Sequence, residues 1–555
     1  MKSPNTADGD SEVFLLAQLA ACVSVFSFLV YLRHHEILLY GDAIAHINIA
    51  RRVFDSRTPG LLQLGTVWLP LPHLLMVPFL ISNWLWQTGI GGSIPSMIAY
   101  IFGVAGIFRL VRGALSIGVA ADRSARLTAL GAAIVYGANP NLIYMQATAM
   151  TESLYLAFFV WALVYFTEFV RAVQASEGSR KTSSQLLKCG WCVAGACLTR
   201  YDGWFLGGVL FVAALAVLLP AKKSSNSFSQ LKITFVKFTL IMAAMPVLWL
   251  AYNAIVYRNA LEFANGPYSA KAIEQKTAVP GAPAHPGTND LSVAASYFLK
   301  AAELNVLPNN WHRVWLLLLV AGTVAILISQ RQIWVLLLLW TPLPFYMLSI
   351  AYSGVPIFLP PWWPFSIYNA RYGLQLLPAL AVFIPLCGYF AARVFPDLKI
   401  KLAIAFSVLL LAGTSYEMVW KRQPVLFQEA WINSGSKNTV EEKLAAQLDR
   451  LPRGSKYLMY LGSHVGAMER AGIPLKDVIN EGNHRPWEKP RDPDGLWERA
   501  LAHPEQYVQY VIAFQGDDVD EQVNKKALSS LLILHVEGQP PVTIYRVSGQ
   551  SQGQM

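Results

Sequence analysis

The sequence predicts an all-α polytopic membrane domain followed by a small soluble α/β domain. Hydrophobic residues make up 54% of the 555 residues and charged residues only 14%, with a mean hydropathy of +0.39, whereas soluble globular chains carry about 25% charged residues. Apolar runs long enough to cross a hydrocarbon core of about 30 Å recur along the chain. From Lys421 onward roughly one residue in four is charged, against roughly one in nine before it, so the membrane-like composition ends there.

The membrane domain is predicted to contain about eleven transmembrane helices. Their expected positions are 13–32, 93–111, 127–146, 154–170, 186–199, 204–220, 233–254, 314–329, 333–350, 374–394 and 402–418. A further apolar segment, 67–86, contains Pro70, Pro72 and Pro78. If it does not cross, the later basic loops all lie on the side of the N-terminus, the positive-inside pattern of a cytoplasmic face. We therefore expect 67–86 to be a juxtamembrane or re-entrant segment, with the N-terminus in the cytoplasm.

This topology gathers the polar segments on the periplasmic or extracellular side of a plasma (inner) membrane. They are the loops 33–93 and 257–313 of a membrane domain 1–420, the turns 151–152 and 200–202, and a C-terminal domain 421–555. The net charge of +10 is then explained by cytoplasmic basic loops. We therefore expect membrane lipid as a partner and no nucleic acid.

The C-terminal domain is predicted from alternating helical and strand patterns. Helices are expected at 439–451, 496–502 and 519–528, and strands at 457–461, 510–514, 531–536 and 542–547. In the membrane domain, the Pro- and Gly-rich segment 278–289 is expected to be a mobile loop tip.

The most informative motif is the segment Tyr40–Arg52, just beyond the first span. Asp42 follows Gly41 at an expected helix start, and His46 lies four residues on, on the same helical face. Apolar residues at 44, 47 and 49 predict a helix lying along the membrane surface. The simpler interpretation, held at equal weight from this motif alone, is that Asp42 is only an N-cap.

Further motifs follow in a fixed order on the same side of the membrane. They are Thr66-Val67-Trp68-Leu69-Pro70-Leu71-Pro72-His73, Ala138-Asn139-Pro140-Asn141, Thr151-Glu152-Ser153-Leu154, Leu198-Thr199-Arg200-Tyr201-Asp202-Gly203-Trp204 and Asn369-Ala370-Arg371-Tyr372. With the Asp42 motif, this order resembles the GT-C superfamily of integral-membrane glycosyltransferases, in particular bacterial members related to protein O-mannosyltransferases (family 39) and aminoarabinose transferases. The resemblance covers roughly residues 31–394.

The resemblance implies transfer of a sugar, hexosyl or mannosyl in type, from a polyprenyl-phosphate carrier to an acceptor on the non-cytoplasmic face, usually with inversion. It implies Asp42 as the catalytic base and Glu152 as a second acidic residue that places acceptor or sugar. The family's proline-rich helix often carries a lysine near the carrier phosphate, where this chain has Leu69 and His73. The acceptor could be lipid, glycan or protein.

The chemistry explains these residue types independently. Displacement at an anomeric carbon needs one carboxylate to take the proton of the acceptor hydroxyl. A phosphodiester leaves as a stable anion, so a fixed positive charge helps more than a general acid. Arg200 and Arg371 are candidates because a guanidinium can donate two parallel hydrogen bonds to phosphate. The equally weighted alternative for each is an arginine that snorkels to the interface.

Other residues near these motifs have weaker or alternative interpretations. Tyr201 and Tyr372 could flank the isoprenoid or sugar, and Asp202 could simply pair with Arg200. His46 and His73 are candidates for substrate contact, and with Asp42 they form a less favoured candidate divalent-metal site, since histidine with carboxylate is a plausible ligand set. The expected mechanism itself requires no cofactor.

Two other classes of protein remain open. A secondary transporter also has many spans, but transporters show internal repeats and midplane polar sites, which this sequence lacks. A non-catalytic assembly scaffold would tolerate substitution of Asp42 and Glu152. We favour the glycosyltransferase because the polar residues cluster on one face.

Overall fold

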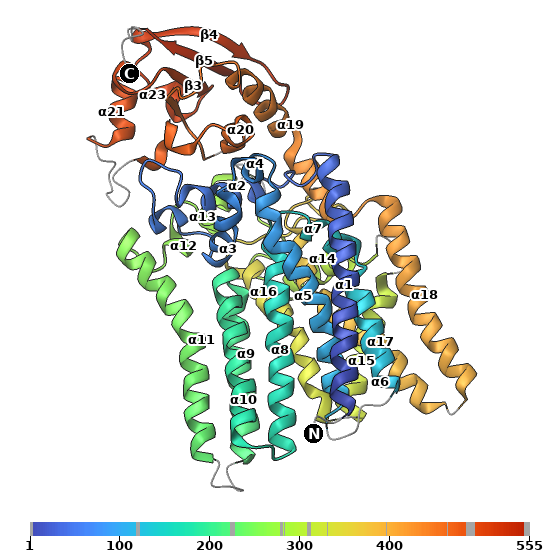
Figure 1. Cartoon of the computed structure of the whole chain (residues 1–555). Coiled ribbons are helices and arrows are strands. Elements are labelled where there is room, and N and C mark those ends of the chain that lie inside the picture. Colours follow the sequence, from blue (N-terminus) through green and yellow to red (C-terminus); the bar gives the residue numbers. More distant parts are fainter. Residues whose placement is uncertain are drawn as a thin grey trace.

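The computed structural model describes residues 4–117, 123–221, 228–277, 281, 283–307, 312–329, 331–395, 397–462, 464–483 and 494–548. Long helices form an upright bundle, and a smaller α/β part sits on one end of it (Figure 1). The N-terminus lies at the opposite end of the bundle, as an odd number of crossings requires. Of the expected loop tip 278–289, residues 278–280 and 282 lie outside the described residues.

The long helices follow the predicted spans. They are α1 (Pro4–Arg33), α5 (Ile90–Leu115), α6 (Arg123–Gly137), α8 (Glu152–Gln174), α9 (Ser179–Thr199), α10 (Asp202–Ala221), α11 (Phe228–Tyr257), α15 (His312–Ser329), α16 (Pro342–Tyr352), α17 (Leu377–Val394) and α18 (Leu398–Arg422). Within the described residues, eight helices are long and apolar enough to cross a membrane. The predicted spans 127–146, 186–199 and 314–329 correspond to helices that fall short of this standard.

The segment 127–146 was predicted as one continuous span, which is wrong, because it forms two separate helices. Helix α6 ends at Gly137, and a separate helix α7 (Pro140–Gln146) begins after Asn139, whose side chain accepts a hydrogen bond from the backbone N–H of Leu142. Pro140 has no backbone N–H to continue a helical ladder, so it fits the first position of a new helix instead.

The proline-rich segment 67–86 forms two short helices, α3 (Leu71–Leu80) and α4 (Asn83–Gln87). Ten residues of helix rise only about 15 Å, so α3 cannot cross the bilayer alone. Both helices lie beside α2 (Gly41–Arg52) at the end of the bundle that faces the α/β part (Figure 1). The expectation of a non-crossing segment is confirmed in this respect.

Shorter elements complete the bundle and its loops. They are η1 (Leu61–Leu64), α12 (Glu262–Asn265), α13 (Ala270–Thr277), α14 (Leu291–Leu304), η2 (Arg331–Trp340) and η3 (Ala370–Leu376). The chain then passes from α18 through α19 (Val425–Leu448) into the α/β part. Gly435, with φ of +42°, kinks α19.

The α/β part contains a five-stranded sheet in the order β2-β1-β3-β5-β4. Its elements are β1 (Tyr457–Met459), α20 (Val465–Ala471), η4 (Leu475–Asp477), β2 (Val478–Ile479), η5 (Glu481–Asn483), α21 (Leu496–Ala502), α22 (Pro504–Tyr507), β3 (Tyr510–Phe514), α23 (Asp518–Gln522), η6 (Lys525–Ala527), β4 (Leu528–Leu534) and β5 (Val542–Val547). Strand β1 pairs parallel with β2 and β3, whereas β5 pairs antiparallel with β3 and β4.

Strand β3 is buried on both faces, which explains its continuous apolar run. Tyr510, Ile512 and Phe514 join the large core that continues into the helical bundle, while Val511 and Ala513 pack in a second cluster with α21. The predicted helix 519–528 is wrong in length: α23 stops at Gln522, and Leu528 already begins β4. Strand β2 was not predicted, because two paired residues are too short for a periodic signal.

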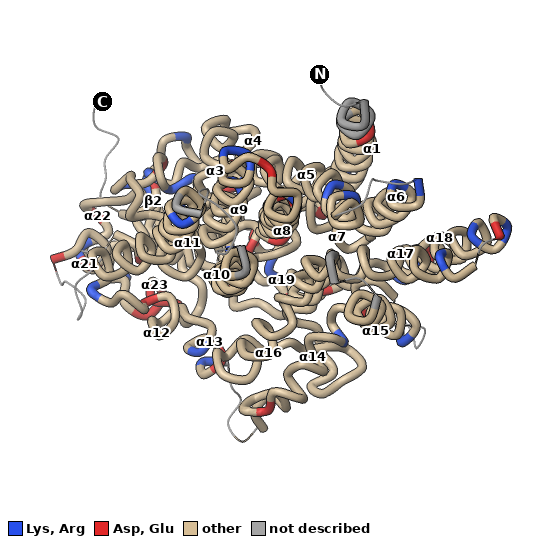
Figure 2. The backbone as a smooth tube through the Cα atoms, turned by 90° about the horizontal axis from the view of Figure 1, so that it is seen from below, with Lys and Arg blue, Asp and Glu red and all other residues tan. Residues whose placement is uncertain are grey.

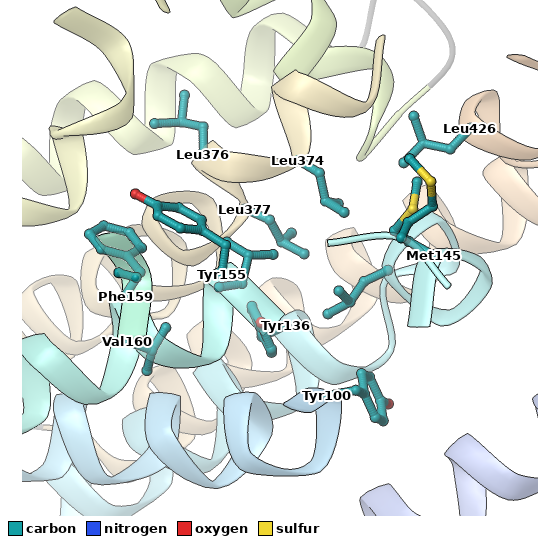
Figure 3. Packing of buried hydrophobic residues seen from close by; sticks show 14 of the residues in the cluster. Tyr100, Tyr136, Met145, Tyr155, Phe159, Val160, Leu374, Leu376, Leu377 and Leu426 are labelled. Atoms are coloured by element: carbon teal, nitrogen blue, oxygen red, sulfur yellow. The ribbon is translucent and has the colours of Figure 1, made fainter. Parts of the chain in front are cut away.

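The core of the bundle joins segments that are far apart in sequence. Figure 3 shows Tyr100 of α5, Tyr136 of α6 and Tyr155 of α8 around the leucines of η3. The Tyr100 hydroxyl donates a hydrogen bond to the carbonyl of Gly137 at 2.6 Å, so this buried hydroxyl has a partner inside the core. Leu426 of α19 lies beside Met145 of α7, which ties the start of the α/β part to the bundle (Figure 3).

Helix α2 differs from the expected surface helix. Ile44 and Ile47 are buried, and Asn48, Ile49 and Arg51 on the other sides are buried as well. The helix lies between α3 and α5 on one side and α20 of the α/β part on the other. A second layer of protein therefore covers the face that sequence reasoning assigned to the membrane surface.

Candidate active site

A network of charged side chains lies where the bundle meets the α/β part. Its members come from five separate segments: Asp42, Glu152, Arg200, Asp202, Arg371 and Glu429. The structure thus brings together five residues that the sequence selected and adds a sixth, Glu429.

Asp42 stands in the first turn of α2 and is not its N-cap. Tyr40 occupies the cap position and makes no side-chain cap hydrogen bond. The Asp42 carboxylate instead accepts a hydrogen bond from Nη2 of Arg371 at 2.7 Å. Its side chain remains 36% exposed, whereas the Glu152 side chain is fully buried. Asp42 is therefore the carboxylate of this network that a substrate can reach most readily.

Arg371 sits at the centre of the network. Asn369 precedes it with φ of +58°, a left-handed conformation that asparagine tolerates, and this turn begins η3. Besides Asp42, the guanidinium lies 3.6 Å from Glu152 and 3.9 Å from Glu429. Its Nε is buried without a hydrogen-bond partner among the described residues. Arg371 thus keeps donor capacity that the resting network does not use.

Arg200 makes more hydrogen bonds than Arg371. Its Nη1 donates to Glu152 at 2.9 Å, its Nη2 to the Tyr346 hydroxyl at 2.9 Å, and its Nε lies 3.4 Å from Asp202. Arg200 lies in the tight turn between α9 and α10. This turn requires glycine at position 203, because a Cβ there would overlap the backbone of Ala196. Every guanidinium nitrogen of Arg200 therefore has a protein partner.

Glu152 links the two arginines. It is the first residue of α8, where the helix dipole favours a negative charge. One carboxylate oxygen contacts both Arg200 and Arg371, and the other, Oε2, has no hydrogen-bond partner in the described part of the chain. A buried oxygen left in this state offers an acceptor to a substrate hydroxyl.

Tyr372 lies between the arginines. The guanidinium carbons of Arg200 and Arg371 are 5.3 and 5.5 Å from its ring centroid, and its ring stacks on Tyr346 at 5.2 Å. Cation–π contact stabilises both charges from the same ring. Tyr201 behaves differently, since its hydroxyl donates to the Val67 carbonyl and its ring stacks on Phe263.

His46 of α2 and His73 of α3 form a buried pair that joins the two helices. Nδ1 of His46 lies 2.9 Å from Nε2 of His73, and the His46 ring packs on Trp68 at 4.6 Å. Burial, with a further contribution from Arg371 and Arg200, lowers the pKa of His46 to about 3, so His46 is neutral near pH 7.

The candidate metal site is not assembled in the described residues. The two histidines bond each other while Asp42 pairs with Arg371, and no group of three His, Cys, Asp or Glu side chains is arranged to hold a metal there.

Sequence reasoning missed Glu429, which enters from the α/β side. The start of α19 is fixed by two contacts: Asn141 accepts from the Leu426 backbone N–H, and the Tyr40 hydroxyl donates to the Leu426 carbonyl. One turn later Glu429 accepts from the backbone N–H of Asn369 at 3.1 Å. A lone carboxylate in the apolar run 425–431 was the available signal. The partner it would meet could not be read from the sequence.

A polar cleft of about 680 Å³ adjoins the first turn of α2. Its walls come from the kink of α19, the loop after β1 and the turn between β4 and β5, and include Ser436, Lys437 and His464. The Lys437 ammonium lies 3.7 Å from the position that a Cβ on Gly41 would occupy. Lys437 therefore lies between the cleft and the start of α2.

This architecture is a known fold, the one that the resemblance to the GT-C superfamily implied. The solved structures that share it include ArnT from Cupriavidus metallidurans bound to undecaprenyl phosphate, with a TM-score of 0.55, 12% identity and coverage of 98% of this chain and 99% of that one. The apo state of the same ArnT matches with a TM-score of 0.53, 13% identity and the same coverage. No protein-family model and no curated protein sequence matches the chain.

Proposed function

We propose that the protein is a glycosyltransferase that moves a sugar from a polyprenyl-phosphate carrier to an acceptor hydroxyl, with inversion. The observation that carries the proposal is the pairing of one accessible carboxylate, Asp42, with an arginine, Arg371, whose Nε has no hydrogen-bond partner among the described residues. The ArnT structure with the same fold was solved with undecaprenyl phosphate bound, which supports a lipid-linked donor. The sugar is hexosyl or mannosyl in type on the strength of the motif resemblance alone.

Asp42 is the base in this proposal. It takes the proton of the acceptor hydroxyl while that oxygen attacks the anomeric carbon and the bond to the carrier phosphate breaks. The acceptor approaches from the polar cleft beside Gly41. Glu152 orients both arginines, and its free oxygen receives a hydroxyl of the sugar or acceptor.

Arg371 holds the departing phosphate. In the resting network its strongest contact is Asp42. A carrier phosphate that competes for Arg371 would release Asp42 from that contact, which leaves the carboxylate free to accept a proton as the donor binds. Arg200, with all its nitrogens already bonded, serves to hold Glu152 and Asp202 in place.

The test is Asp42→Asn in the purified full-length protein, offered a panel of polyprenyl-phosphate sugars with product detected by mass spectrometry. Loss of the base is expected to reduce turnover by about 10² or more, while carrier affinity is retained. Asp449→Asn, a carboxylate at the end of α19, is the matched control. Near-normal turnover of Asp42→Asn would refute the assignment, and transport of a solute in sealed vesicles without a lipid-linked sugar would favour the transporter.

The active face is proposed to be periplasmic or extracellular, with the N-terminus in the cytoplasm. In a cysteine-free background, Ala284→Cys in the loop before α14 is expected to react with a membrane-impermeant reagent in intact cells. Ser176→Cys, between α8 and α9, is expected to react only after lysis. Both positions are exposed. The reverse pattern would place the charge network on the cytoplasmic side.

A further inference from the structure

A second cavity lies at the other end of the bundle, between α9 and α11. Its volume is about 640 Å³, and its walls include Arg180, Lys188 and Lys237. The helices are joined along its floor by a hydrogen bond of 2.8 Å between the hydroxyls of Ser183 and Thr234. Figure 2 looks at this end of the molecule and shows basic residues at the ends of several helices, including α11.

The positions of the three cations make this groove unusual. Lys188 stands eight residues beyond Arg180 on α9, about 12 Å further along the helix axis, and Lys237 lies at a similar height on α11. Both lysines thus lie more than two turns inside their helices, and both are exposed. At such a depth in a membrane-spanning helix a charged side chain is costly unless it reaches the interface or meets a counter-ion.

The groove itself supplies no such counter-ion. None of its ten lining residues is acidic, and none of the three cations pairs with a carboxylate in the part of the chain that the structure describes. The Lys188 ammonium lies over the Tyr165 ring, 5.5 Å from its centroid. Trp191, one turn above Lys188, lines the same cavity and is 61% exposed, which suits contact with an acyl chain.

We propose that this groove binds the phosphate headgroup of an anionic phospholipid from the leaflet opposite the charge network. Arg180, Lys188 and Lys237 neutralise the phosphate, the serine and threonine hydroxyls lie at its base, and one acyl chain runs upward over Trp191. Basic pockets between transmembrane helices bind anionic headgroups by this logic. The site is independent of glycosyl transfer, since it shares no residue with the proposed active site.

The first test is native mass spectrometry of the purified full-length protein with phosphatidylglycerol or with phosphatidylcholine of the same acyl chains. The wild-type protein is expected to retain one phosphatidylglycerol molecule at least tenfold more tightly than phosphatidylcholine. The Lys188→Gln/Lys237→Gln variant should lose this preference. The control is Lys399→Gln/Lys401→Gln, which removes two lysines near the start of α18 and outside the groove, and it should keep the preference.

A second measurement uses the unaltered protein, so that a folding defect in the variant cannot decide the outcome. Phosphatidylglycerol with a photoreactive acyl chain should crosslink to peptides around Trp191, and excess inorganic phosphate should not displace it. Equal retention of both lipids by the wild-type protein would overturn the proposal. So would equal loss in the control variant, crosslinking elsewhere, or full displacement by inorganic phosphate.

Discussion

Arg200 and Arg371 have similar sequence contexts but different surroundings. Arg200 follows helix α9 and Arg371 lies at the start of η3, both at the end of the bundle that carries the α/β part. Each is followed directly by a tyrosine. Arg200 is enclosed by Glu152, Asp202 and Tyr346, with every nitrogen bonded. Arg371 pairs with the partly exposed Asp42, and its Nε lies 3.6 Å from Glu152 without a hydrogen-bond partner among the described residues. The difference indicates that Arg200 maintains the structure of the site and that Arg371 is available to a ligand.

The largest expected effect is a loss of protein stability, which should occur when Arg200 is replaced and so distinguishes it from Arg371. Arg200→Ala leaves Asp202 buried without its cation and leaves Glu152 with only the longer contact to Arg371, and breaking a buried pair from one side typically costs about 3–5 kcal/mol. Thermal unfolding should therefore occur well below the wild-type temperature. Arg393→Ala, at the end of α17 distant from the network, is the control and should change the unfolding temperature little. A stable Arg200→Ala that loses only carrier affinity would reverse the assignment.

Arg371→Ala is expected to act mainly on the carrier. A charge-assisted hydrogen bond to phosphate is worth about 1.5–3 kcal/mol, so the affinity for a polyprenyl phosphate should fall roughly 10- to 100-fold. Arg371→Lys should recover only part of this loss, since the planar fork is gone. Binding can be followed by tryptophan fluorescence or by native mass spectrometry. Unchanged affinity in Arg371→Ala would remove the phosphate role from this residue.

A smaller effect, which depends on pH, is expected where α20 packs against α2. Glu469 is buried there and accepts a hydrogen bond from Asn48 of α2, and burial raises its pKa to about 8. The folded protein thus keeps a proton that the unfolded chain loses above about pH 4.5. This contribution to stability is fully present below that pH and is lost as the pH rises through about 8.

The measurement is the unfolding temperature between about pH 5 and pH 8.5. Glu469→Gln, which cannot ionise, should remove part of the decline seen in the wild-type protein over this range. Glu442→Gln, an exposed carboxylate on the neighbouring α19, is the control and should leave the pH profile unchanged. Identical profiles for wild type and Glu469→Gln would show that this carboxyl does not limit stability.

Composition and periodicity were enough to predict the membrane class, most helix positions and four of the five strands. Burial of a 20-residue apolar helix or of a strand such as β3 leaves a local pattern in the chain itself. The break between α6 and α7 was harder to predict, because it depends on one proline, Pro140, within a largely apolar segment. The strand β2 depends on pairing with β1 and has almost no local signal.

For the candidate site, the sequence indicated residues of suitable chemistry and predicted that they lie together on one face of the molecule. Only the tertiary structure decided how they pair. Tyr346 and Lys437 come from segments whose local sequence carries no mark of the site, and Glu429 is marked only as a lone carboxylate in an apolar run. The distinction between Arg200 and Arg371 likewise depends on side chains more than a hundred residues away, since the partners of a buried charge are set by packing and not by neighbours along the chain.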